Sequence, residues 1–257
     1  MQTAERVSHT DLSDNYVFQR SQLAYFEARK IVSGDILEIG SGQGYGINII
    51  ANKSKRYVAI DKFATSINQP KDAPQIEFLN INVPPLSGLE DNSFDFVVSF
   101  QVIEHIKKDK ALIKEVYRIL KPGGKYIVST PNIKTSLTRN PWHIREYTID
   151  EFEQLLLNPF EKVEKKGVFG NEKVMKYYQE NKKGVERITR FDIFNLQYLL
   201  PRQVLQIPYD ILNRRNRKKI LEGNNDLVAS IKMDDYYMDK AEDTCFDLFY
   251  IAEKSKH

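Results

Sequence analysis

The chain has 257 residues, of which 41% are hydrophobic and 28% are charged, and its formal net charge at pH 7 is +3. This is ordinary globular composition, and the length is enough to bury a core without covalent cross-links. A single cysteine, Cys245, excludes an internal disulfide framework and favours a reducing compartment, so we expect a cytoplasmic protein. The polar N-terminus and the lack of any run of about 18 apolar residues predict neither a signal peptide nor a membrane-spanning helix.

Short apolar runs alternate with amphipathic stretches in the first half of the chain, which is typical of a parallel sheet covered by helices. Each apolar run is bounded by turn residues, as expected of buried strands. In chain order, the pattern predicts a helix at 21–32, a strand at 35–40, a helix at 45–52, a strand at 56–61, a helix at 63–69, strands at 76–81 and 94–100, a helix at 108–120 and a strand at 124–130.

The second half of the chain follows a different pattern. A capping box from Thr148 to Glu151 predicts the start of a helix, and strands are expected at 163–170 and 245–254. Residues 171–240 lack the alternation and are rich in Tyr, Lys and Arg, so we interpret them as a helical insertion before the last strand. The predicted fold is therefore α/β, with a doubly wound, mostly parallel sheet of seven strands. We expect an N-terminal helical cap (1–34), an α/β core (35–170), an insertion that forms a substrate lid (171–240) and the final core strand (241–257).

A glycine-rich loop, DILEIGSGQGYG (35–46), directly follows the first predicted strand. Such a loop directs backbone N–H groups at a ligand on the carboxyl edge of the sheet. The glycines do not have the spacing of the dinucleotide fingerprint, and Glu38 stands two residues before the first of them. An acid at this position repels a pyrophosphate but attracts an ammonium and a sulfonium group, which favours S-adenosylmethionine. The candidate contacts in the loop are Glu38, Gly40, Ser41, Gly42 and Gly44.

These motifs resemble those of class I S-adenosylmethionine-dependent methyltransferases. ILEIGSGQGYG is similar to the first motif of that family, SFDFVVSFQVIEHI (93–106) to its fourth strand and the helix start after it, and RILKPGGKYIVSTPN (118–132) to its type 11, ubiquinone-biosynthesis-like branch. The resemblance covers residues 35–134 and implies a Rossmann-like methyltransferase fold. It also implies that the cofactor is converted to S-adenosyl-L-homocysteine.

Further cofactor contacts follow from the resemblance. Asp61 ends the second strand, where such enzymes place an acid that receives both ribose hydroxyls, and Lys62 follows it. Asn82 stands where the family usually has an acid that accepts the adenine amino group; its amide oxygen can accept the same bond, and the N–H of Val83 can reach the ring. At the end of the fourth strand we expect contacts from two more residues, Phe100 and Gln101.

Two histidines are candidates for removing a proton from the acceptor. His143 lies in the loop NPWHIREYT (140–148), which follows the fifth strand and should overhang the cofactor, and His105 begins the helix after the fourth strand. An ordinary histidine has a pKa of about 6.5, which suits a general base. Each could instead only pack, and Arg145, Glu146 and Tyr147 could orient the substrate. Arg20 could pair with the methionine carboxylate of the cofactor or be a solvated charge.

The apolar and basic stretch at 199–219 could be a solvated helix end, or it could rest on an anionic membrane or hold a phosphorylated, carrier-linked substrate. It has too few aromatic residues for a base-stacking platform, so we expect no nucleic-acid partner. No His or Cys cluster has metal-ligand spacing, and we expect no metal.

The sequence thus predicts transfer of a methyl group to an oxygen or nitrogen of a small molecule or carrier-linked sugar, by direct in-line displacement. Two alternatives remain open: a methyltransferase that acts on a protein or tRNA, and a non-catalytic scaffold that binds S-adenosylmethionine.

Overall fold

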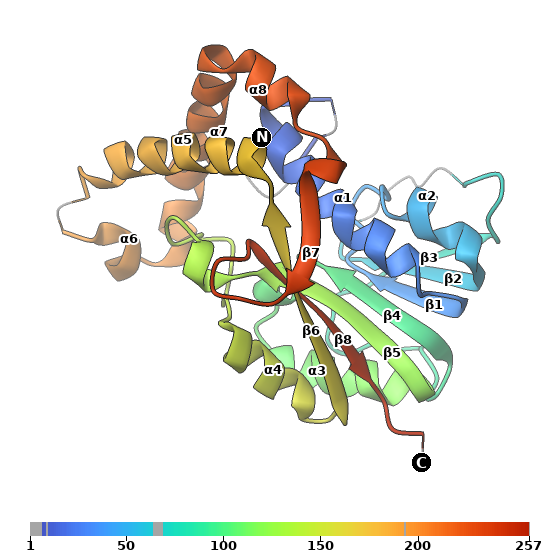
Figure 1. Cartoon of the computed structure of the whole chain (residues 1–257). Coiled ribbons are helices and arrows are strands. Elements are labelled where there is room, and N and C mark those ends of the chain that lie inside the picture. Colours follow the sequence, from blue (N-terminus) through green and yellow to red (C-terminus); the bar gives the residue numbers. More distant parts are fainter. Residues whose placement is uncertain (1–6, 9, 64–68, 193, 257) are drawn as a thin grey trace.

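The computed structural model describes residues 7–8, 10–63, 69–192 and 194–256 (Figure 1). Within these ranges, eight strands form one sheet in the order β3-β2-β1-β4-β5-β8-β6-β7. The first five are parallel, whereas β8 runs antiparallel to both β5 and β6, and β7 runs antiparallel to β6. The strands are β1 (Gly34–Ile39), β2 (Ser54–Asp61), β3 (Ile76–Asn80), β4 (Phe94–Phe100), β5 (Leu120–Pro131), β6 (Lys162–Gly170), β7 (Tyr236–Lys240) and β8 (Asp247–Glu253).

Helices cover both faces of the sheet, which confirms the predicted doubly wound α/β class. They are α1 (Asn15–Arg29), α2 (Ile47–Ile50), α3 (Asp109–Ile119), α4 (Ile149–Leu157), α5 (Glu172–Thr189), α6 (Leu196–Leu199), α7 (Arg202–Gly223) and α8 (Asn225–Ser230). Helix α1 begins six residues before its predicted start, and the helix expected at 63–69 falls largely on residues 64–68, outside the described ranges.

Alternating side chains along the parallel strands feed two separate cores. In β2, Tyr57 and Ala59 pack against α1 and α2, while Val58 and Ile60 pack on the opposite face, toward α3 and α4. This is the two-sided burial expected of a parallel sheet. The sheet therefore holds the carboxyl ends of its parallel strands rigidly at one edge, where the loops that carry the candidate residues begin.

Two local signals of the second half have different outcomes. The capping box is confirmed, because the Thr148 side chain accepts from the Glu151 N–H and the Glu151 carboxylate accepts from the Thr148 N–H at the start of α4. The prediction of seven strands is wrong, since β7 adds an eighth within the region expected to be helical. This edge strand has mostly exposed side chains, and its sequence YYMDK lacks the apolar run that marks a buried strand.

Helices α5, α7 and α8 gather at one end of the sheet with the N-terminal part of α1, and α6 forms a tip that points away from β1–β3 (Figure 1). A third apolar cluster joins these elements; it includes Tyr16 of α1, Tyr177 of α5, Ile220 of α7 and Val228 of α8. Among the described residues, no helix combines the length and the apolar character that crossing a bilayer requires.

Candidate active site

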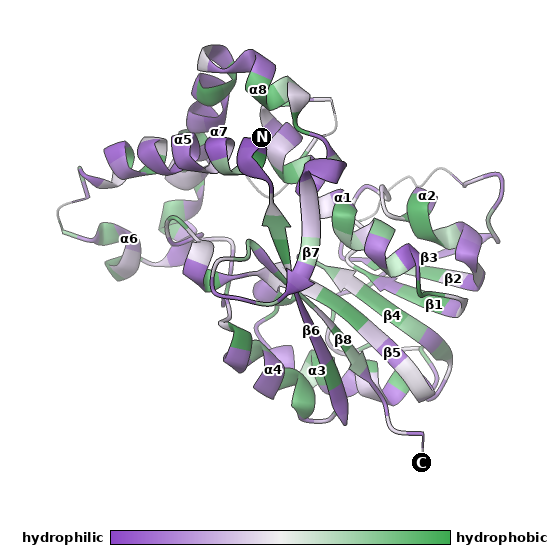
Figure 2. Ribbon diagram, in the orientation of Figure 1, coloured by the Kyte–Doolittle hydropathy of each residue, from purple (hydrophilic) through white to green (hydrophobic). Residues whose placement is uncertain are grey.

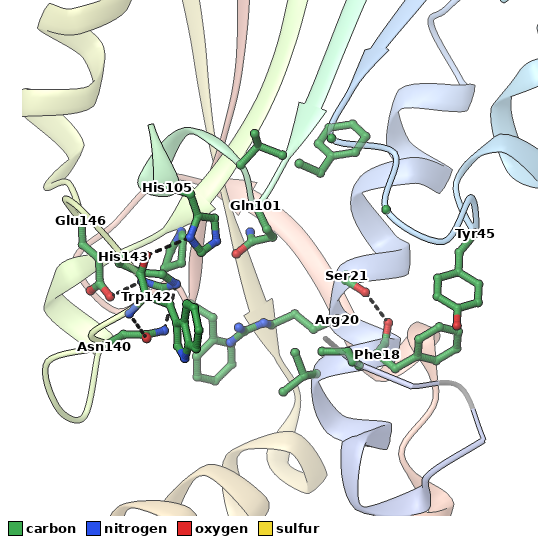
Figure 3. Close-up of a pocket in the computed structure, with 18 of the residues that line it drawn as sticks. Phe18, Arg20, Ser21, Tyr45, Gln101, His105, Asn140, Trp142, His143 and Glu146 are labelled. Atoms are coloured by element: carbon green, nitrogen blue, oxygen red, sulfur yellow. Dashed lines mark hydrogen bonds and ion pairs between the residues drawn. The ribbon is translucent and has the colours of Figure 1, made fainter. Parts of the chain in front are cut away.

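A cavity of about 1150 Å³ lies at the carboxyl ends of the parallel strands. Its walls come from the loops that follow β1, β2, β3, β4 and β5, and from α1, α5 and α7. Figure 3 shows His105, His143 and Trp142 on one side of the cavity and Tyr45 with Phe18 on the other, with Arg20 and Gln101 between them. The loops that are distant in sequence therefore enclose one continuous space.

The glycine loop forms one wall of this cavity. Gly40 has φ +80°, and a Cβ atom there would lie 2.3 Å from Cγ2 of Val102, so both conformation and packing require glycine. Gly42 has φ +54°, and a Cβ atom there would meet nothing within 4 Å. Ser41 is buried beside them and also lines the cavity. The loop thus offers an open backbone surface at Gly42.

Asp61 lies across from the glycine loop at the end of β2. One carboxylate oxygen accepts the N–H of Gly42 at 2.8 Å, and the other accepts the N–H of Phe63 at 2.9 Å. The carboxylate lines the cavity, where each oxygen can accept a further hydrogen bond. Lys62 is exposed next to it, with Nζ 5.0 Å from the centre of the Phe63 ring.

Glu38 lies away from the position expected for a ligand contact. Its side chain is buried, does not line the cavity, and accepts hydrogen bonds from the hydroxyls of Tyr25 and Tyr57, both at 2.8 Å. Burial raises the pKa of Glu38, and the two hydroxyls oppose that rise by donating to the carboxylate. In this structure, Glu38 anchors helix α1 and strand β2 beneath the glycine loop.

The residues expected around the adenine line the same end of the cavity. Asn82 is exposed and Val83 is half-buried after β3, while Phe100 is buried at the end of β4. Phe100 packs edge-on against Tyr25, with ring centres 4.7 Å apart. Gln101 has φ +57°, and its Nε2 lies 3.3 Å from Oγ of Ser129.

Arg20 reaches the cavity from α1 and has a partner within the protein. Its Nε lies 3.1 Å from a carboxylate oxygen of Asp247, which is buried at the start of β8. The guanidinium carbon also lies 5.8 Å from the centre of the Tyr16 ring and of the Phe246 ring. The expected contact with a methionine carboxylate stays a prediction, since Asp247 already balances this charge.

The opposite end of the cavity contains a histidine pair, with ring centres of His105 and His143 5.0 Å apart. Nδ1 of His105 lies 3.0 Å from the carbonyl oxygen of Trp142, which can only accept, so this nitrogen carries the proton. His143 Nδ1 lies 2.6 Å from a carboxylate oxygen of Glu146. Both side chains of that second pair are about nine-tenths buried.

Other groups hold the histidine end in place. Nδ2 of Asn140 lies 2.9 Å from Nε2 of His143, and the Asn140 side-chain oxygen accepts the N–H of Trp142. The indole N–H of Trp142 donates to Asp210 of α7 at 2.9 Å. The loop after β5 is therefore tied both to itself and to the region expected to be an insertion.

The expectation that no metal-binding group exists does not survive the folding of the chain. In the described part of the protein, one ligand atom from each of Glu104, His105 and His143 falls within 4.8 Å of the others. The spacing along the sequence gave no hint of this group, because 38 residues separate His105 from His143.

Comparisons with known proteins agree with this geometry. Residues 37–128 match the family model of a methyltransferase domain, type 11. The chain is 36% identical over 175 residues to a probable S-adenosylmethionine-dependent methyltransferase of Mycolicibacterium smegmatis, covering 65% of this chain and 68% of that relative. The chain belongs to the S-adenosylmethionine-dependent methyltransferases.

Two more distant similarities place this methyltransferase within the family. It is 29% identical over 117 residues to the ubiquinone biosynthesis O-methyltransferase of Xanthomonas oryzae pv. oryzae, covering 43% of this chain and 49% of that relative, so it spans only about half of that enzyme. It also resembles the crystal structure of an S-adenosylmethionine-dependent methyltransferase from Thermotoga maritima, described as a possible histamine N-methyltransferase, with a TM-score of 0.53 and 16% identity over 93% of this chain and 92% of that one. The structural likeness confirms the Rossmann-like fold.

The methyltransferase cavity fits its cofactor, S-adenosylmethionine. Open space above Gly42 lets a ligand approach the backbone closely, and Asp61 presents a carboxylate beside it. Val83 and Phe100 provide apolar surface for an aromatic base. These are features of the protein alone, and they suit a ligand with a ribose and an adenine.

Several residues that line the methyltransferase cavity were not predicted. Tyr209, Asn213 and Arg217 enter it from α7, and Tyr177 and Tyr178 enter it from α5. The residues of α7 are spaced four apart and so share one helix face, a signal that the sequence contained. The partners of Glu38, Tyr25 and Tyr57, had no such local signal.

Proposed function

We propose that this enzyme transfers a methyl group to an oxygen, or a nitrogen, of a small molecule or a carrier-linked sugar. The observation that carries the proposal is the single cavity, which has a nucleoside-binding wall at Gly42 and Asp61 and a histidine pair at its other end. When bound, S-adenosylmethionine supplies an electrophilic sulfonium methyl group, which the acceptor atom attacks in line without a covalent enzyme intermediate. The chain then has to position the acceptor and take up its proton.

We assign the cofactor to the wall built from the loops after β1 to β4. Backbone groups of Gly40, Ser41, Gly42 and Gly44 face the amino-acid part, and Asp61 accepts the two ribose hydroxyls. Asn82, Val83, Phe100, Gln101 and Lys62 surround the base and ribose. Glu38 acts through its two tyrosines as a positioning residue.

For proton removal we assign the pair formed by His143 and Glu146. The carboxylate accepts the Nδ1 proton of His143 at 2.6 Å, which leaves the lone pair on Nε2 and stabilises the imidazolium that forms when the acceptor proton arrives. Asn140 occupies Nε2 in this structure, so an acceptor hydroxyl replaces that amide as it binds. His105, in edge contact with His143, holds the second position at the acceptor.

The acceptor end of the cavity is polar and aromatic, which supports a small hydroxylated substrate. Trp142 and Tyr209 offer aromatic faces, while Asn213 and Arg217 offer hydrogen-bond donors. Residues 171–240 supply part of this wall, which is why we assign them as a lid that excludes water. A protein or tRNA substrate would instead need a broad exposed surface, and here the same face of α7 points into a cavity.

One observation favours a second way to activate the acceptor. Glu104, His105 and His143 could share a divalent cation, and both histidines already donate their Nδ1 protons, one to Trp142 and one to Glu146, as metal-bound histidines usually do. A cation there lowers the pKa of a bound hydroxyl. Loss of turnover on chelation, with recovery on adding one defined divalent metal, supports this route; turnover that is insensitive to chelation supports the base alone.

The experiment that tests the proposed function is transfer of a labelled methyl group from S-adenosylmethionine to panels of phenols and carrier-linked sugars. With an active acceptor, Glu146→Gln should lower kcat by about 10²- to 10⁴-fold with little change in KM, and it should flatten the rising limb of the pH–rate profile. Glu153→Gln is the matched control, because Glu153 pairs with Lys165 on α4, outside the cavity. Equal activity of both variants contradicts the assignment of the base.

A further inference from the structure

The tip formed by α6 and the start of α7 exposes an unusual amount of apolar surface. In the described part of the chain, six large apolar side chains are more than half exposed, with exposed fractions of 58% to 84%, and all six lie between residues 191 and 207. We call this group the α6–α7 patch; it consists of Phe191, Phe194, Tyr198, Leu199, Val204 and Ile207. Single exposed apolar residues are normal on soluble proteins, but a cluster of this kind marks an interaction surface.

The patch is presented on a defined structure. The carboxylate of Asp192 accepts the N–H groups of Leu196 and Gln197 at the start of α6, and Arg139 donates to the carbonyl oxygen of Gln197 at 2.7 Å. Thr138 also donates to the Gln197 side chain. The backbone of the tip is thus tied to the loop after β5 while the apolar side chains stay outside. Figure 2 shows hydrophobic positions on this tip, next to strongly hydrophilic helices.

Positive charge surrounds the apolar tip. Residues 182–223 contain ten Lys and Arg and only four Asp and Glu, although the whole chain has a net charge of just +3. Lys182, Arg187 and Arg190 are exposed along α5 and its end, and Arg215 and Lys219 are exposed on α7. This region is therefore the basic part of a protein whose remainder is slightly acidic.

We propose that the α6–α7 patch docks the enzyme on an anionic phospholipid bilayer. Large apolar side chains that project from a convex tip insert among acyl chains, and cations around them pair with anionic headgroups. A nucleic acid would use the cations but would leave the six apolar side chains in water. A lipid surface satisfies both features at once.

Docking of this kind acts close to the chemistry, and this consequence rests on the proposed function. The guanidinium of Arg202, at the start of α7, donates to the carbonyl oxygen of His143 at 3.2 Å, and Tyr209 and Asn213 line the cavity from the same helix. A bilayer at the patch therefore lies beside the acceptor end of the cavity. The matching acceptor class is a molecule anchored in that bilayer by an apolar chain.

Vesicle sedimentation tests the docking without any acceptor. We expect the full chain to bind vesicles of equal parts phosphatidylcholine and phosphatidylglycerol and to bind pure phosphatidylcholine far more weakly. The triple change Phe191→Ser, Leu199→Ser and Ile207→Ser should weaken binding to the anionic vesicles roughly tenfold or more. The matched control carries Ile31→Ser, Leu157→Ser and Tyr237→Ser, which alter apolar side chains exposed elsewhere, and it should bind like the unaltered protein.

Charge is tested separately. Arg215→Glu with Lys219→Glu should weaken binding to anionic vesicles about tenfold, whereas Lys53→Glu with Lys55→Glu, on the opposite edge of the sheet, should leave it unchanged. Light scattering gives the oligomeric state of each variant. Docking is refuted if the unaltered protein does not sediment with anionic vesicles, or if the serine variant binds them as well as its control. It is refuted also if the serine changes only convert a dimer into a monomer, because the patch is then an interface between copies. Labelled transfer to water-soluble acceptors is measured in parallel, so loss of vesicle binding with intact turnover separates this inference from the proposed function.

Discussion

Asp61→Ala should weaken cofactor binding by about a hundredfold. In the structure, both carboxylate oxygens of Asp61 are held in place by backbone N–H groups, at 2.8 Å and 2.9 Å, so the side chain is ordered before the ligand arrives. Each ribose hydroxyl can add one hydrogen bond to a charged acceptor, worth about 1.5–3 kcal/mol. Because Asp61 is partly exposed, we take the lower value for both bonds, about 3 kcal/mol, which is about a hundredfold in Kd.

Calorimetric titration with S-adenosylhomocysteine measures this loss. Asp72→Ala is the control, because Asp72 is an exposed acid outside the cavity wall. Removal of Asp61 also releases the Gly42 and Phe63 amides, so a second ligand, the 2′-deoxy analogue, isolates the ribose contact. The unaltered protein should bind this analogue about tenfold more weakly, and Asp61→Ala should not discriminate. The reasoning fails if Asp61→Ala binds within about threefold of the unaltered protein, or if it still discriminates between the two ligands.

Three further predictions concern stability and reactivity. Hydrogen bonds from Arg118 hold the pKa of Glu115 below its ordinary value, so Glu115→Gln should lose roughly 1 kcal/mol of unfolding free energy at pH 7, and urea titrations should show the difference vanish as the pH falls through that lowered pKa; a constant difference argues against it. Burial raises the pKa of Cys245 to about 11, so at pH 8 its thiol should react with a chromogenic disulfide only in denaturant, and fast reaction of the folded protein would show that the site opens. A Cβ at position 46 would lie 1.8 Å from Cε1 of Tyr25, so Gly46→Ala should cost about 1–3 kcal/mol by urea unfolding, and unchanged stability would mean that the ring moves freely.

Sequence patterns located the parallel core well because its strands are buried on both faces. The run 94–100 coincides with β4, and the other parallel strands begin or end within a few residues of their predicted bounds. Strand β7 escaped because an edge strand has one solvated face, so YYMDK has no apolar run. The start of α1 was misplaced because its first turns are polar and gain their packing from Tyr177 and Phe246, which come from distant parts of the chain.

The candidate site divides in the same way. Gly40, Gly42 and Asp61 belong to local motifs whose neighbours in sequence are also their neighbours in space, and the structure brings them together. Glu38 has the right position in the motif, but its carboxylate points to Tyr25 and Tyr57, and only the folded chain reveals that contact.

The acceptor end depended on contacts across long separations. His105 meets His143 across 38 residues, and Trp142 meets Asp210 across 68. No periodicity links such pairs, because they arise from two loops and a helix that the sheet brings to one edge. The pairing of His143 with Glu146 is the exception, since three residues separate them and the loop folds back on itself.

The central claim is that one cavity holds the cofactor at Asp61 and the acceptor at the histidine pair. A crystal structure of the enzyme with S-adenosylhomocysteine tests it most directly. The account predicts both ribose hydroxyls within hydrogen-bond distance of the Asp61 carboxylate and the sulfur atom facing His105, His143 and Trp142. A ligand bound elsewhere, or one whose sulfur faces Lys62 and Phe63 instead, would contradict the account.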